Sequence, residues 1–64
     1  MKFKSGDVII ATSTGSIFKI LKVNEFYGRY LIERDPRDTW NEIELVDKAC
    51  SLYVEPNEIM KEIL

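Results

Sequence analysis

The sequence predicts a small, mostly β domain built from five short antiparallel strands. β-branched and aromatic residues gather in runs of strand length, and glycine, proline, asparagine and aspartate fall between these runs. Apolar residues make up 45% of the 64-residue chain and charged residues 31%, which is a globular composition. Because so short a chain has room for only one hydrophobic core, we expect residues 1–64 to form a single domain.

The first three strands are expected at residues 7–12, 16–23 and 29–34. Gly15 lies in the turn between the first two, where its freedom to adopt a positive φ is useful. Residues 16–23 alternate imperfectly, because each of the two faces carries a lysine among aliphatic and aromatic residues. This pattern indicates a strongly twisted or bulged strand.

The second half of the chain is open to two interpretations. Glutamate alternates with aliphatic residues over 42–46, which predicts a fourth strand with one buried face. The same residues can also continue as a helix through residue 50, and the two assignments stay open. A short fifth strand is expected at residues 51–54, and Asn57 is a good N-cap for a short helical turn at the C-terminal end.

The residues around Pro36 predict a tight turn after the third strand, because proline presets φ and aspartate caps neighbouring backbone groups. Asp35 and Asp38 could instead pair for metal binding or acid–base chemistry. Arg34 and Arg37 interleave with them and neutralise the segment, so we interpret the two aspartates as turn caps.

Residues in the first half resemble a known family of small barrels. A Gly-Asp pair, Gly6 and Asp7, stands before the first expected strand, and aliphatic runs follow at 18–23 and 30–32. This pattern is similar to the entry of SH3-like barrels of the KOW and Tudor kind. The resemblance implies five bent strands that close on a small aliphatic core. The Lys-x-Gly-Asp start also resembles short phage-encoded proteins, which implies a phage or mobile-element origin.

The sequence offers little for catalysis or metal binding. The chain has no histidine and one cysteine, Cys50, whereas a structural zinc site draws on four such ligands. Lys48 could activate the Cys50 thiol as a nucleophile, but we expect Cys50 to be a small buried residue. The three glycines are dispersed, so no phosphate-binding loop is present. We expect no enzyme activity, no catalytic residue, no metal and no cofactor.

The expected location is the cytoplasm. No apolar run approaches the ~20 residues of a membrane span, and the basic residues at the start are not followed by the apolar segment of a secretory signal. A lone cysteine fits a reducing compartment. We therefore expect no membrane partner.

The net charge of −2 hides an asymmetry between the two halves. Residues 1–32 carry five lysines and arginines against two acidic residues, whereas residues 33–64 carry four against nine. The acidic half offers a surface to a basic partner protein, although a solvated charged face is the simpler interpretation. The acidic residues that would form it are Glu42, Glu44, Asp47, Glu55, Glu58 and Glu62.

Basic and aromatic residues along the expected hairpin and the loop after it form the leading candidate binding surface. Its members are Lys19, Lys22, Arg29, Arg34 and Arg37, with the aromatic residues Phe26, Tyr27, Tyr30 and Trp40. Cations beside stacking aromatics are typical of single-stranded nucleic-acid surfaces, and the same residue types anchor protein–protein contacts. A solvated hairpin edge with the aromatic side chains in the core is the third interpretation.

These observations favour a non-enzymatic protein-interaction module. The resemblance to phage proteins further implies an accessory factor that binds and modulates a host protein. The alternative is a single-stranded nucleic-acid-binding barrel. An apolar stripe near the C-terminal end is expected to plug an open end of the barrel or to form a homodimer contact. The stripe consists of Ile59, Met60, Ile63 and Leu64.

Overall fold

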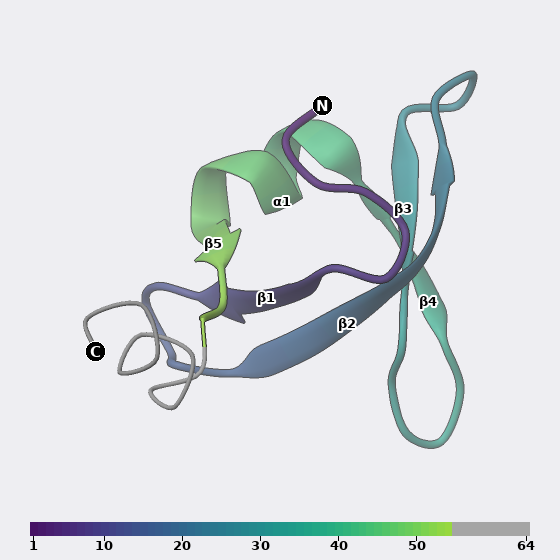
Figure 1. The fold of residues 1–64 in the computed structure, drawn as a ribbon. Helices are drawn as coiled ribbons and strands as arrows, with labels where there is room; N and C mark the ends of the chain where they lie inside the picture. Colours follow the sequence, from purple (N-terminus) through teal and green to yellow (C-terminus); the bar gives the residue numbers. More distant parts are fainter. Residues whose placement is uncertain (55–64) are drawn as a thin grey trace, which may run out of the picture.

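The computed structural model describes residues 1–54, which form a five-stranded antiparallel sheet and one short helix (Figure 1). The elements are β1 Val8–Ala11, β2 Ile17–Asn24, β3 Arg29–Ile32, β4 Thr39–Glu42, α1 Ile43–Ala49 and β5 Cys50–Leu52. The first three strands and the fifth overlap their predicted positions. The mostly β prediction is confirmed, whereas the expected C-terminal helical turn and the apolar stripe lie outside the described residues.

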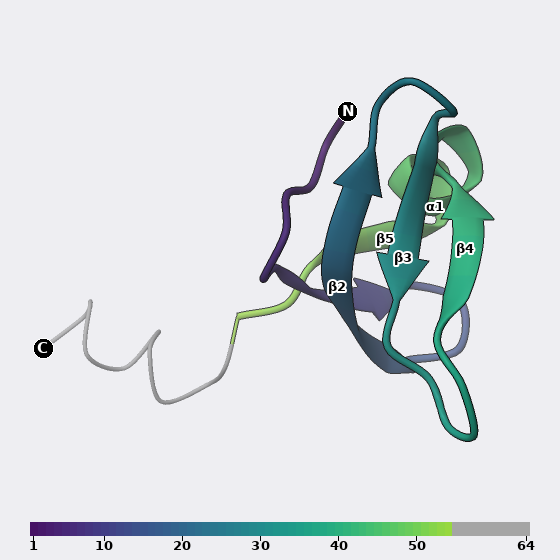
Figure 2. The same cartoon turned by 90° about the vertical axis from the view of Figure 1, so that its right-hand side faces the viewer.

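The sheet is bent but open. Its strand order is β4-β3-β2-β1-β5, and every neighbouring pair is antiparallel. Figure 2 shows β2, β3 and β4 side by side, with β1 and β5 running across them. Within residues 1–54, β4 and β5 form the two edges and do not pair with each other, so closure of the sheet into a barrel stays a prediction.

A bulge in β2 lets the sheet bend. The pairing of β2 with β3 shifts register between Ile20 and Lys22. One extra residue there lets Ile20 and Val23 pack in the core while Lys22 is exposed. Because a bulge increases the local twist of a strand, it turns β2 from its pairing with β1 to its pairing with β3. The predicted twisted or bulged strand is confirmed.

The prediction of a fourth strand at residues 42–46 is wrong, and the helical alternative describes most of this segment. The fourth strand is β4, Thr39–Glu42, and the helix α1 begins at Ile43. Helical spacing brings Ile43 and Val46 to the core, whereas a strand would have placed Ile43 and Leu45 on one buried face. Leu45 is not part of this core and is 63% exposed.

One core lies between the bent sheet and α1. Its fully or nearly buried members are Phe3, Ile9, Ile20, Tyr30, Ile32, Val46 and Cys50. Cys50 is buried as predicted, and desolvation raises the pKa of its thiol, which disfavours the reactive thiolate. Such burial supports the interpretation of Cys50 as a packing residue.

The Tyr30 side chain is fully buried, so its prediction as part of the binding surface is wrong. Its hydroxyl donates a hydrogen bond to Asp47 Oδ1 at 2.8 Å and accepts one from the Phe3 N–H at 3.1 Å. β3, α1 and the N-terminal segment therefore meet at one oxygen atom. The hydroxyl accepts the hydrogen bond of the buried Phe3 N–H, which would otherwise be cut off from water and left without an acceptor.

Asp47 holds the N-terminal segment against α1. Its Oδ2 accepts a hydrogen bond from the Lys2 N–H at 3.2 Å and lies 4.0 Å from the Met1 ammonium group. The Lys2 Nζ group donates to the Cys50 carbonyl oxygen at 3.0 Å. The Asp47 carboxylate, which was predicted as part of an acidic contact surface, is thus engaged within the protein.

The outer edge of β4 is free within the described part of the chain. The Ile43 N–H donates to the Gly28 carbonyl at 2.9 Å, which continues the ladder between β3 and β4. Because hydrogen-bonding residues alternate along an antiparallel strand, Thr39 and Asn41 also face β3. The N–H and C=O of Trp40 and the N–H of Glu42 therefore point away from β3.

Amide hydrogen exchange should alternate along β4. We expect the Asn41 amide to exchange slowly, because it bonds to β3, and the Trp40 and Glu42 amides to exchange rapidly in the free protein. Residue-resolved exchange measured by NMR tests this pattern. Equal protection of the three amides would contradict the register and the free edge.

Alkaline pH should destabilise the protein through Tyr30. Burial raises the pKa of Tyr30 above its usual 10.0, so above pH 10 the unfolded chain ionises this tyrosine while the folded protein keeps it protonated. The contribution is fully present below pH 10 and is lost as the pH rises through the raised pKa. Urea unfolding at several pH values should show this decline.

The matched variants for this experiment are Tyr30→Phe and Tyr27→Phe. Tyr30→Phe should show a smaller loss of unfolding free energy between pH 10 and higher pH than the parent protein, whereas Tyr27→Phe, at an exposed position, should follow the parent. Identical pH profiles for the parent and Tyr30→Phe would show that Tyr30 does not carry the effect.

Candidate binding surface

The outer face of β2, β3 and β4 carries two rows of side chains. Residues directly opposite one another in an antiparallel pair point to the same side of the sheet, so the pairing defines each row. The two rows are Lys22–Leu31–Trp40 and Asn24–Arg29–Glu42. A cation, an aliphatic side chain and an indole thus lie side by side across three strands.

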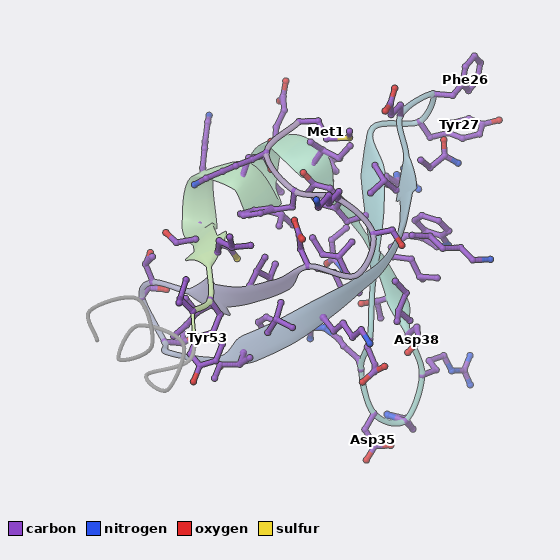
Figure 3. The ribbon with its side chains drawn as sticks, viewed as in Figure 1. Met1, Phe26, Tyr27, Asp35, Asp38 and Tyr53 are labelled. Atoms are coloured by element: carbon purple, nitrogen blue, oxygen red, sulfur yellow. The ribbon has the colours of Figure 1, made fainter. Side chains whose placement is uncertain are left out.

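The hairpin between β2 and β3 adds two aromatic side chains beyond the end of this face. Phe26 is 88% exposed and Tyr27 71%, and their ring centroids lie 4.9 Å apart in an edge-to-face arrangement. Both point away from the sheet in Figure 3. The Tyr27 N–H donates to Asn24 Oδ1 at 3.1 Å, and Gly28 closes the turn with a φ of +66°. Phe26 and Tyr27 thus lie at the tip of the hairpin, between the end of β2 and the start of β3.

Several predicted binding residues come together here, and we refer to their surface as the aromatic face. A hollow of about 220 Å³ is lined by Asn24, Tyr27, Arg29 and Trp40. Trp40 is 47% exposed and lies in the same row as Lys22. The aromatic face consists of Lys22, Phe26, Tyr27, Arg29, Leu31 and Trp40.

Two of the remaining basic residues, Arg34 and Arg37, lie elsewhere, so the predicted basic surface is divided. Lys19 lies on β2, three residues before Lys22; it pairs with Val8 of β1, and its carbonyl oxygen accepts a hydrogen bond from the Glu33 N–H at 2.9 Å. The Arg34 guanidinium lies over the Phe18 ring, 4.9 Å from its centroid. Arg37 belongs to the turn between β3 and β4, at the opposite end of β3 from the β2–β3 hairpin tip.

Carboxylates border the aromatic face. Glu42 is paired with Arg29 across the two strands, and a second hollow, of about 560 Å³, lies beside them. Its lining includes Glu25, Tyr27, Arg29, Glu42 and Glu44. Charges of both signs therefore surround Tyr27. Of the predicted acidic surface, Glu42 and Glu44 lie here, whereas Glu55, Glu58 and Glu62 lie outside the described residues.

The turn between β3 and β4 shows the predicted aspartate cap. Asp38 Oδ1 accepts a hydrogen bond from the Arg34 N–H at 3.2 Å. Figure 3 shows Asp35 and Asp38 at the opposite end of the β3–β4 region from Phe26 and Tyr27. Across residues 1–54, cysteine, aspartate and glutamate side chains form no group of three or more that could hold a metal ion.

A mainly apolar groove was not predicted from the sequence. It has a volume of about 430 Å³ and lies on the core side of the sheet, where β4, α1 and the β1–β2 hairpin approach one another. Its apolar lining consists of Ala11, Phe18, Ile32, Leu45, Val46, Ala49 and Cys50. Arg34, Asn41 and Glu42 add polar groups to the lining. The helix that the sequence left open through residue 50 was the signal for its α1 wall.

Comparisons with known proteins leave the site to be interpreted from its own geometry. No protein-family model, curated protein or solved structure matches the chain. In residues 1–54, α1 falls short of the length and apolar character that crossing a membrane would require.

Proposed function

We propose that this protein is a non-enzymatic protein-interaction module that contacts its partner through the aromatic face. The observation that carries the proposal is the gathering of exposed Phe26, Tyr27 and Trp40 beside Arg29. Aromatic and arginine side chains supply most of the binding energy at protein interfaces. Exposed aromatic side chains lower the solubility of a protein, and a role in binding a partner explains why these three are exposed.

The distribution of charge supports a protein partner over a nucleic acid. A phosphate backbone needs several cations along one path, and Arg34 and Arg37 lie away from the aromatic face. Glu25 and Glu42 border Tyr27 and Arg29, and their carboxylates repel phosphate groups. A protein surface can match charges of both signs, which a nucleic acid cannot.

We include two finer assignments in the proposal. The strand order β4-β3-β2-β1-β5 and a short helix before β5 support an SH3-like arrangement of the sheet. The similarity of the Lys-x-Gly-Asp start to phage-encoded proteins supports an accessory factor whose partner is a host protein. The buried Cys50, with its raised thiol pKa, supports a function without catalysis.

Site-directed photocrosslinking tests the proposal. A photoreactive phenylalanine analogue replaces Tyr27, and in a matched control it replaces the exposed Ser13 in the β1–β2 turn. In a bacterial lysate, position 27 should give a discrete crosslinked protein and position 13 should not. Adding Trp40→Ser should weaken the crosslink about fivefold or more, because truncation of an interface anchor costs over about 1 kcal/mol.

The nucleic-acid alternative is tested in parallel. Fluorescence polarisation with labelled single-stranded oligonucleotides at low salt should show no binding, since the cations are divided between separate parts of the surface. Salt-dependent binding lost on Trp40→Ser, together with no crosslink from position 27, would overturn the protein-interaction proposal in favour of the nucleic-acid one.

A further inference from the structure

We propose that the free edge of β4 is a strand-binding site, at which an extended peptide segment of a partner protein pairs with β4 and fills the apolar groove beside it. This inference rests on the proposed function and specifies how the partner is held. The peptide is expected to carry apolar side chains at alternating positions and an acidic side chain near one end.

Backbone hydrogen bonding provides the first argument. The Trp40 N–H and C=O and the Glu42 N–H all point away from β3, and no strand within residues 1–54 occupies that edge. The Glu42 backbone is extended, with φ −63° and ψ 131°, so the edge keeps strand geometry up to the start of α1. An extended peptide can therefore add to the sheet through main-chain hydrogen bonds.

The groove provides the second argument, because it lies alongside this edge. Asn41 and Glu42 of β4 belong to its lining, together with buried Ile32 and Val46. Its volume of about 430 Å³ falls within the range of ligand-sized hollows. Leu45 of α1 is largely exposed and lines the groove. An apolar side chain of the peptide that enters the groove would pack against it.

The register of the added strand follows from the side-chain direction of β4. Trp40 faces the outer side of the sheet and Asn41 the groove side. A peptide residue opposite Trp40 therefore points outward against the indole, while the residues before and after it point into the groove. The predicted recognition pattern is apolar, any residue, apolar.

Charge supplies the acidic part of the pattern. Arg34 lines the groove, with its guanidinium stacked over Phe18. The salt bridge found in residues 1–54 joins Met1 to Asp47, so the Arg34 guanidinium has no carboxylate partner in this part of the chain. A peptide carboxylate can form a charge-assisted hydrogen bond with it.

Glu42→Pro tests the edge with little disturbance of the fold. The observed φ of −63° matches the value that proline imposes, and the preceding residue is in a strand, which proline also favours. The Glu42 N–H lies outside the β3–β4 ladder, so its loss removes a hydrogen bond only from the added strand. Glu42→Ala is the matched control, because it removes the same carboxylate and keeps the N–H.

The probe is a surface-displayed library of random eight-residue peptides, selected on the parent protein. Enriched peptides should show apolar residues at i and i+2 with an acidic neighbour, and should bind Glu42→Pro about tenfold or more weakly than Glu42→Ala. A lost hydrogen bond and the bulk of the proline ring give this factor. The Trp40 amide should exchange slowly in the complex. Thermal unfolding of both variants verifies that they are folded.

Four outcomes would overturn the proposal: no enriched pattern, equal affinity of the two Glu42 variants, a Trp40 amide that stays unprotected, or a parent protein that dimerises through this edge and loses dimerisation in Glu42→Pro. The last outcome would assign the edge to a second copy of the chain. A crosslink from position 27 that persists in Glu42→Pro, with no selected peptide, would leave the proposed function standing while the edge site fails.

Discussion

The hydroxyl group of Tyr30 is the contact on which the arrangement of this small domain depends. It lies in a fully buried position and joins β3 to the Phe3 amide and to the Asp47 carboxylate on α1. Asp47 in turn holds the backbone of Lys2. A domain of this size buries little apolar surface, so a satisfied polar contact among three segments contributes a large share of its specificity.

The open sheet links this internal contact to function. Because Tyr30 and Asp47 hold α1 across the core side of the sheet, Val46 and Leu45 form one wall of a groove next to β4. The same strand carries Trp40 on its outer face and leaves backbone groups free along its edge. One short strand thus presents an aromatic surface, unpaired main-chain groups and an apolar groove, which together suit recognition of another polypeptide.

Local patterns in the sequence predicted much of the fold and only part of the candidate site. The bulged second strand and the buried Cys50 followed from alternation and residue type, whereas the sequence left open whether Phe26 and Tyr27 are exposed. Tyr30 was misplaced because the partner that draws its hydroxyl inward, Asp47, is 17 residues away in the chain. The separation of the basic residues on the surface depends on how strands far apart in the sequence bend, and so does the groove. Local sequence patterns do not predict this bending.

A double-mutant cycle on Tyr30→Phe and Asp47→Ala tests the central contact most directly. Unfolding free energies of the parent, both single variants and the double variant give the coupling between the two side chains. A buried hydrogen bond that organises three segments predicts a coupling of about 0.5–3 kcal/mol. The double variant should then be only slightly less stable than the less stable of the two single variants. Strictly additive losses, with a coupling near zero, would contradict the role of Tyr30 as the organising contact.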